Sequence, residues 1–391
     1  MNISNSIKYI GVDDLDIDLF DSQYKVPEGV SYNSYVILDE KVAVMDTADQ
    51  RKSEEWMKNL TDALNGRQVD YLVVHHMEPD HASNIAALAA AYPEAKIILS
   101  AAALKMVPNF FPEADLTSRC QVVKEGDTLS LGTHTLQFIA APMVHWPEVL
   151  MSYEQTEKVL FAADGFGKFG AIQNEERNAD GTPADWACEA RRYYFNIVGK
   201  YGMQVQNVLK KAAGLDIHAI APLHGPVLRG AALTEAIRLY DIWSRYEPET
   251  EGVFVAHASI HGGTRKVAER VVEMLKAKGY KVAVSDLTRD DMAEAIEDAF
   301  RYPKLVLLAA SYDAGVFPPM HDFLYHLQIK GFQHRRFALI ENGSWAPSAG
   351  KVMKEMIGQL KDCEIVEPMV TIRSRMKESD IPQLESLINN L

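Results

Sequence analysis

The chain has 391 residues, of which 47% are hydrophobic and 24% charged, which is typical of a globular protein with material for two hydrophobic cores. Its formal net charge of −14 argues against nucleic acid as a partner, because phosphate binding requires clustered Lys and Arg. The sequence shows no signal-peptide pattern and no apolar run long enough to span a membrane. Cys120, Cys188 and Cys363 form no C-x-x-C pair, which indicates a reducing compartment, so we expect a cytoplasmic protein.

The first part of the chain mixes short predicted strands with occasional helices. The segment YVILDEKVAVMD (35–46) predicts a hairpin that turns at Asp39-Glu40. Further strands are predicted at 71–74, 97–100, 128–142 and 158–164, and helices at 52–64, 84–92, 185–213 and 230–245. This mixture favours sheets packed between outer helices.

Beyond the polar stretch SRYEPETEG (244–252), strands and helices alternate regularly. Strands are predicted at 253–259, 281–287, 304–311, 336–342 and 364–372, and helices near 264–278, 290–300, 320–328, 347–360 and 380–390. A strand–helix alternation repeated in this way predicts a doubly wound parallel sheet. We therefore expect one domain at 1–249 and a second at 250–391.

Five potential metal ligands crowd the segment HHMEPDHASN (75–84), which connects a predicted strand to a predicted helix. In extended chain, positions two apart point the same way, so His76 and Glu78 can reach one site. Asp80 and His81 lie at the turn into the helix, whereas His75 should point away from His76 and have a supporting role. A lone His or Asp here would usually be a helix cap or a hydrogen-bonded core residue. This density without metal would leave several polar groups in need of separate partners, so the sequence predicts metal binding.

Three further candidates each follow a predicted strand: His145 in APMVHWPE, Asp164 in FAADGFGKFGA and His224 in APLHGPV. Taken singly, each is more often a hydrogen-bonding residue than a ligand. Together with the loop they supply imidazoles and carboxylates but no thiolate, a donor set that suits iron or manganese at least as well as zinc.

The second part carries three loops that together indicate a flavin site. SIHGGT (259–264) joins a strand to a helix, and its backbone N–H groups can hold a phosphate. SYDAGVFPPM (311–320) and ENGSWAPSAGK (341–351) also follow strands, at the edge where doubly wound sheets bind ligands. Tyr312 and Trp345 can stack on an isoalloxazine ring, although the simpler interpretation is tight turns with both aromatics in the core. The predicted contacts are Ser259, Ile260, His261, Gly262, Gly263, Thr264, Ser311, Tyr312, Asp313, Ala314, Gly315, Asn342, Gly343, Ser344, Trp345 and Ala346.

The H-x-E-x-D-H motif at 76–81, followed by single His, Asp and His residues, resembles that of the flavodiiron proteins, or A-type flavoproteins. Zinc hydrolases of the same fold carry H-x-H-x-D-H, and here Glu78 replaces the middle His. SYNSY (31–35), DGFGKFGA (164–171), RRYYFNIVGKYG (191–202) and FPPMHDFLYHLQIKGFQHRR (317–336) are also similar to that family. The phosphate loop resembles the flavodoxin pattern [ST]-x-[ST]-G-x-T, with His261 at a hydroxyl position. Ala346 and Pro347 replace the Gly and Trp of the family's GSYGW.

The resemblance implies an α/β chain in which a metallo-β-lactamase-like αββα domain with two irons precedes a flavodoxin-like doubly wound parallel sheet that binds FMN. The implied ligands are His76, Glu78 and His145 for one iron, Asp80, His81 and His224 for the other, and Asp164 as a bridge. It also implies that Tyr194 reaches the substrate pocket. The implied activity is reduction of dioxygen to water, of nitric oxide to nitrous oxide, or of both.

The resemblance further implies a head-to-tail homodimer or homotetramer, in which the flavin of one subunit faces the irons of another. This sequence has no four-cysteine rubredoxin segment. We therefore expect an external electron donor, either rubredoxin or a deazaflavin, and neither nucleic acid nor membrane as a partner. One alternative is a zinc or di-metal hydrolase fused to a flavodoxin module, against which Glu78 argues. Another is an electron carrier with a vestigial metal site, against which the complete set of seven ligands argues.

Overall fold

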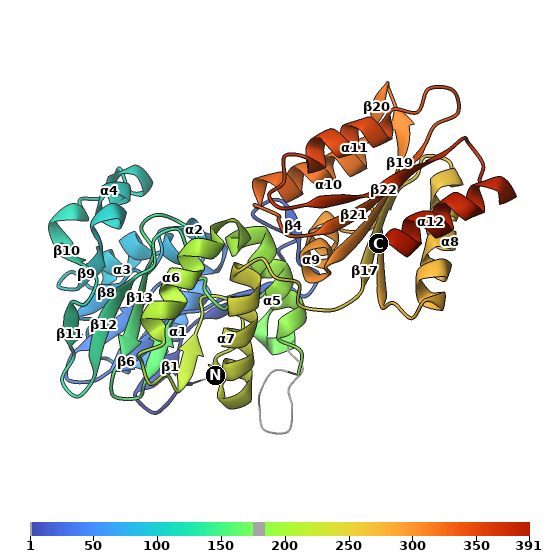
Figure 1. Cartoon of the computed structure of the whole chain (residues 1–391). Helices are drawn as coiled ribbons and strands as arrows, with labels where there is room; N and C mark the ends of the chain where they lie inside the picture. Colours follow the sequence, from blue (N-terminus) through green and yellow to red (C-terminus); the bar gives the residue numbers. More distant parts are fainter. Residues whose placement is uncertain (1, 175–183) are drawn as a thin grey trace. The chain divides into compact units, whose positions relative to one another are not determined.

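Figure 1 shows the computed structural model of the chain, which describes residues 2–174 and 184–391. The chain divides into two compact units, Met1–Tyr194 with Met203–Asp241, and Phe195–Gly202 with Ile242–Leu391. The second unit therefore takes in residues 195–202 and 242–249, which lie within the first of the two predicted domains. In the described part of the chain, no helix is both long and apolar enough to cross a bilayer.

The first unit contains two six-stranded mixed sheets. One has the order β1 (Ile7–Tyr9), β6 (Tyr35–Leu38), β7 (Val42–Met45), β8 (Tyr71–Val73), β9 (Lys96–Ser100) and β10 (Cys120–Val123). The other has the order β11 (Thr128–Ser130), β12 (Thr135–Ala140), β13 (Leu150–Glu154), β14 (Val159–Phe161), β15 (Ala219–Ala221) and β16 (Leu228–Arg229). Two short pairs lie apart from them, β2 (Val12–Asp14) with β5 (Val30–Tyr32) and β3 (Leu19–Phe20) with β4 (Tyr24–Lys25). The hairpin predicted at 35–46 is confirmed, because β6 and β7 pair antiparallel.

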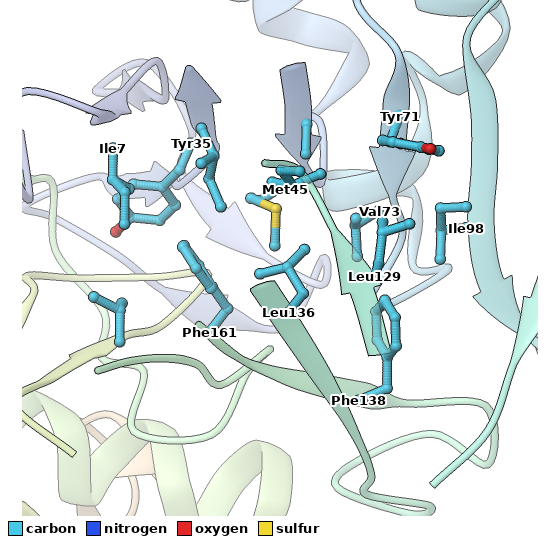
Figure 2. Close-up of a cluster of buried hydrophobic side chains, with 14 of the residues drawn as sticks. Ile7, Tyr35, Met45, Tyr71, Val73, Ile98, Leu129, Leu136, Phe138 and Phe161 are labelled. Carbon is cyan, nitrogen blue, oxygen red and sulfur yellow. The ribbon is translucent and has the colours of Figure 1, made fainter. Parts of the chain in front are cut away.

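The core of this unit lies between its two sheets. Figure 2 shows Met45, Val73 and Ile98 of the first sheet facing Leu136 and Phe138 of the second. All of these side chains are buried. Full burial of an aliphatic or aromatic side chain of this size contributes about 1.5–3 kcal/mol to folding, so this layer fixes the relative position of the sheets.

Helices flank the sheets of the first unit. They are α1 (Ser53–Leu64), α2 (Pro79–Ala82), α3 (Ile85–Ala91), α4 (Ala101–Phe110), α5 (Ala187–Tyr193), α6 (Gly202–Ala212) and α7 (Gly230–Ser244). Two predicted elements prove to be interrupted. The strand predicted at 128–142 is broken at Gly132, whose φ of 128° lets the chain turn between β11 and β12. The helix predicted at 185–213 is broken by a π-helical turn, Tyr194–Val198, and a 3-10 turn, Gly199–Tyr201.

The second unit is a parallel sheet with helices on both faces. Its strands run in the order β18 (Val282–Asp286), β17 (Val253–Ala258), β19 (Lys304–Tyr312), β21 (Arg336–Asn342) and β22 (Glu364–Ile372), and the short β20 (Gly315–Val316) pairs with β19. Numbered along the chain, this is the 2-1-3-4-5 order of flavodoxin-like folds. Figure 1 shows α8 (Gly263–Ala277) and α12 (Ile381–Asn390) on one face, and α9 (Met292–Arg301), α10 (Pro318–Ile329) and α11 (Ala349–Ile357) on the other. The two units together confirm the predicted fold class.

Candidate metal centre and flavin-binding edge

The structure gathers the seven predicted metal ligands at the carboxyl ends of strands in the first unit. The segment 75–81 follows β8 and enters α2, a one-turn helix with Pro79 at its first position. His145 follows β12, Asp164 follows β14 and His224 follows β15. The side chains form two groups whose donor atoms lie within 4.8 Å of one another. The first group, metal position 1, contains His76, Glu78 and His145 together with Asp164, and the second, metal position 2, contains Asp80, His81 and His224. Asp164 contacts histidines of both groups.

Metal position 1 is centred on one oxygen of Asp164. The Nε2 atoms of His76 and His145 each lie 3.2 Å from Asp164 Oδ2. Glu78 Oε2 lies 3.1 Å from His76 Nε2 and 3.0 Å from His145 Nε2. Two imidazole nitrogens and two carboxylate oxygens thus converge on one point.

Metal position 2 is centred on the other oxygen of the same carboxylate. Asp164 Oδ1 lies 3.3 Å from His81 Nε2 and 3.6 Å from His224 Nε2. Asp80 Oδ2 lies 3.1 Å from the first of these nitrogens and 3.3 Å from the second. The two nitrogens are themselves only 3.1 Å apart. Asp164 therefore presents one oxygen to each group, which is the geometry of a bridging carboxylate.

The buried carboxylates test whether this site fits metal ions. Among the described residues, neither oxygen of Asp80 nor of Asp164 has a hydrogen-bond partner, although all four atoms are buried. A buried carboxylate in this condition is costly unless a cation or proton compensates it. The donor set contains no thiolate, so two hard or borderline divalent cations such as iron fit it.

The pKa shifts describe the same electrostatics. Burial opposes the charged form of His76, but Asp164, Glu148 and Glu78 together raise its pKa to about 10. For His145, burial is again outweighed by Asp164 and Glu78, and the pKa rises to about 9. Despite burial, the surrounding imidazoles hold the pKa of Asp164 well below its usual value. In the metal-free protein, protons held on the imidazoles therefore balance the charge of the carboxylates, and metal ions would displace these protons.

Two groups outside the predicted set orient the ligands. Glu148, which sequence reasoning missed, lies 2.7 Å from His76 Nδ1 through Oε1 and is almost fully buried. The carbonyl of Ser31 lies 2.7 Å from His224 Nδ1. The sequence signal for Glu148 was weak. It is an acidic residue three positions after the predicted ligand His145, in HWPE, and such residues are more often exposed.

His75 lies on the opposite side of the loop from His76, as its position predicts. Its Nδ1 contacts Asp46 Oδ2 at 2.5 Å and its Nε2 contacts Ser152 Oγ at 2.7 Å, all within the buried interior. Asp46 Oδ1 also accepts a hydrogen bond from the His75 backbone N–H at 2.7 Å. This chain of contacts anchors the ligand loop to β7 and β13.

Aromatic side chains surround the candidate centre. The ring of Tyr193 lies 5.5 Å from that of His224, and its pKa is raised by burial and then by Asp164 and Asp80. The predicted catalytic residue, Tyr194, instead packs edge-on against Tyr240, with ring centroids 4.9 Å apart. The π-helical turn begins at this point, so regular helical spacing does not tell which tyrosine faces the ligands. The role of Tyr194 stays a prediction, and Tyr193 is a further candidate.

The predicted flavin contacts lie in loops at the carboxyl ends of β17, β19 and β21. The backbone of Gly262 has a φ of 83°, and its N–H donates to Ser259 Oγ at 3.1 Å, which shapes the turn into α8. A Cβ at Gly263 would lie 3.5 Å from Asn342 Nδ2, and one at Gly343 would lie 3.1 Å from Ser311 Oγ. The three loops are therefore adjacent.

The two aromatics of this edge are not core residues. Trp345 is 88% exposed and Tyr312 is 45% exposed, so the simpler expectation that they pack inside is wrong. Asp313 and Ala314 both adopt positive φ, which is uncommon for residues other than glycine and found at ligand-binding loops. Exposed aromatic faces beside a phosphate-type loop fit a flavin.

Two of the predicted contacts use their side chains to brace the loops. Ser311 Oγ accepts hydrogen bonds from the backbone of Ser348 at 2.8 Å and Ala349 at 3.2 Å. Asn342 exchanges two hydrogen bonds with the backbone of Ser374, at 3.0 and 3.1 Å. Their contribution to a flavin site is thus to fix the shape of the loops around it.

Comparisons with known proteins agree with this architecture. A family profile described as "ODP family beta lactamase" matches residues 30–225, just over half of the chain. The anaerobic nitric oxide reductase flavorubredoxin of Escherichia coli O1:K1 / APEC is 28% identical over 358 residues, which cover 89% of this chain and 73% of that protein. An uncharacterized protein of Methanocaldococcus jannaschii is 26% identical over 97% of this chain and 95% of its own length.

Solved structures give the same result. The rubredoxin oxygen:oxidoreductase of the anaerobe Desulfovibrio gigas superposes with a TM-score of 0.92 at 26% identity, covering 100% of this chain and 97% of that one. The flavodiiron protein of Giardia intestinalis shares the fold, with a TM-score of 0.91 at 23% identity over 99% of this chain and 95% of that one. Two of these proteins are named as a reductase and as an oxidoreductase. The chain belongs to the flavodiiron protein family.

Proposed function

We propose that the protein reduces dioxygen to water, nitric oxide to nitrous oxide, or both, at a diiron centre that receives electrons through FMN. The observation that carries this proposal is the orientation of Asp164, which presents one oxygen to each of two groups of ligands. Two further points support it, namely the relation to two oxidoreductases that are named for nitric oxide and for oxygen, and a second unit with exposed aromatics beside a phosphate-type loop.

The residues of the first unit have separable tasks in this proposal. Position 1 and position 2 would each hold one iron, with Asp164 keeping the two at a fixed separation. When bound, the irons supply electrons and open positions for a diatomic molecule, and FMN supplies electrons singly. Reduction of O2 to two H2O consumes four electrons and four protons, and reduction of two NO to N2O and H2O consumes two of each. We assign Tyr193 as a hydrogen-bond donor beside the carboxylates, because its phenol remains neutral there.

The rest of the proposal concerns partners and location. We propose the division into a diiron domain, 1–249, and an FMN domain, 250–391, with loops 259–264, 311–315 and 342–346 around the flavin. From the resemblance we further propose a head-to-tail homodimer or homotetramer and an external donor, either rubredoxin or a deazaflavin. One relative is itself named as a rubredoxin oxidoreductase, which supports the former. A cytoplasmic location is supported by three free cysteines.

Side-by-side gas consumption tests the proposed activity. The iron- and FMN-loaded protein, supplied with a reduced donor, would be followed with O2 and NO electrodes in separate runs, and N2O would be measured by mass spectrometry. We expect consumption of at least one gas, with two NO consumed per N2O formed. Protein loaded with zinc in place of iron is the matched control, because it keeps the fold and the flavin but lacks redox metal. Equal rates in both preparations would contradict the proposal.

A further inference from the structure

The two metal positions are supported differently behind their ligands. One of the two histidines of position 1, His76, contacts a buried carboxylate, because Glu148 Oε1 lies 2.7 Å from its Nδ1. The same oxygen accepts a hydrogen bond from the Met77 backbone N–H at 2.9 Å. Both Glu148 and His76 are at most 1% exposed, so this contact is shielded from solvent.

Among the described residues, the groups behind the ligands of position 2 are neutral. His224 Nδ1 contacts the backbone carbonyl of Ser31 at 2.7 Å. Among the described residues, His81 Nδ1 is buried and has no hydrogen-bond partner. Both positions otherwise have the same kinds of ligand, which are two imidazoles, one carboxylate of their own and one oxygen of the shared Asp164 carboxylate. The difference between the positions therefore lies in Glu148.

A carboxylate behind an imidazole changes how the imidazole binds metal. By accepting the Nδ1 proton of His76, Glu148 selects the tautomer whose Nε2 carries the free lone pair, and Nε2 is the atom that faces Asp164 and Glu78. A charged acceptor also makes the imidazole a stronger donor than a carbonyl does, and its negative charge attracts a cation in a site of low dielectric.

The charge count of the site changes as well. Asp80, Glu78 and Asp164 alone leave two divalent ions with one uncompensated positive charge. Glu148 adds a further negative charge that is buried in direct contact with a ligand. This extra negative charge lies on the side of position 1.

We propose that Glu148 is a positioning residue that makes position 1 the tighter of the two metal positions and the first to fill. The inference rests on the proposed dinuclear centre and deepens it. The inference can be tested without any reaction of O2 or NO, because it concerns the difference in metal affinity between the two positions.

Stepwise zinc binding tests it. His224→Ala removes a ligand of position 2, and His145→Ala removes a ligand of position 1, so each variant isolates the opposite position. In the His224→Ala background, Glu148→Gln should weaken zinc binding by about 10- to 100-fold, measured by competition with a chromophoric chelator. In the His145→Ala background the same change should alter affinity by no more than about twofold. A merely structural role would weaken both positions alike.

Glu154→Gln is the matched control. Glu154 is also fully buried and lies 3.1 Å from a histidine, His134 Nδ1, but that pair is separate from the metal ligands. The Glu154→Gln substitution should leave the zinc affinities of both positions unchanged. If Glu148→Gln does not fold, Glu148→Asp keeps the charge while withdrawing it from His76, and its loss should again fall on position 1 alone.

The outcomes separate the two proposals. A wild-type chain that does not bind two zinc ions would overturn both the dinuclear centre and this inference. The other case is a wild-type chain that binds two zinc ions. If Glu148→Gln then weakens zinc binding equally at both positions, or at neither position, this inference is overturned and the proposed function still stands.

Discussion

The two candidate sites are built by opposite means. In the first unit, ligands from four separate segments meet at the carboxyl ends of strands, and buried carboxylate oxygens lie without hydrogen bonds among the described residues. In the second unit, the site is a rim of loops with exposed aromatics, and several of its polar side chains already have partners within the loops. A buried charged site requires its cations for electrostatic balance, whereas an exposed loop site keeps its shape alone. The metal ligands should therefore depend strongly on their ions, and the loops only weakly on flavin.

The largest expected effect is that of Asp164→Ala. Both positions share this carboxylate, so its loss should weaken metal binding by more than about 100-fold and leave flavin content unchanged. That loss exceeds the roughly 10- to 100-fold typical of residues that only hydrogen-bond to a metal ligand. Metal and flavin per chain would be measured after dialysis against a chelator. Asp216→Ala, which removes an exposed carboxylate paired with Lys158, is the control. Normal iron content in the Asp164 variant would refute the bridge.

Gly263→Val should do the reverse. A Cβ at this position would lie 2.9 Å from the carbonyl oxygen of Ser374, so the phosphate loop must shift. We expect FMN affinity to fall by at least about 10-fold, equivalent to about 1.4 kcal/mol, with metal content intact, as measured by flavin fluorescence titration. Gly214→Val, where an added Cβ meets no atom within 4 Å, is the control. Loss of iron with flavin retained would contradict the separation of the two sites.

The pH dependence of stability should also differ between metal-free and metal-loaded protein. The pKa values of His76 and His145 are raised to about 10 and about 9 in the folded protein. At a pH above the ordinary pKa of histidine, these side chains therefore bind more protons in the folded protein than in the unfolded protein. That contribution is fully present below about pH 6.5 and is lost as pH rises through about 9 to 10. The thermal midpoint of metal-free protein should therefore fall across this window, while metal-loaded protein changes less. Parallel calorimetric scans of both forms from pH 6 to 10 would check this, and identical profiles would contradict it.

The smallest expected effect is that of Trp345→Ala. An aromatic contact of this kind contributes about 0.5–1.5 kcal/mol, so FMN affinity should fall by about 2- to 12-fold. Trp345→Phe keeps a stacking face and should retain most of the affinity in the same fluorescence titration. No change in either variant would mean that Trp345, which is 88% exposed, does not contact the flavin.

Most of the fold could be predicted from the sequence, because the patterns that indicate its strands and helices are periodic and local. The regular alternation after residue 251 identified the parallel sheet, and the crowded loop at 75–84 identified the ligand cluster. The π-helical turn at Tyr194 was not accessible, because it depends on packing rather than on local composition. Nor was Glu148, since a carboxylate in a loop is usually solvated and only the fold brings it against His76.

Metal and flavin content of protein purified from its own host tests the central claim most directly. The account predicts two iron atoms and one FMN per chain, with a flavin absorption band that bleaches on anaerobic reduction and returns when O2 or NO is added. Zinc without iron, together with a flavin band that neither gas restores, would contradict it and favour the hydrolase alternative.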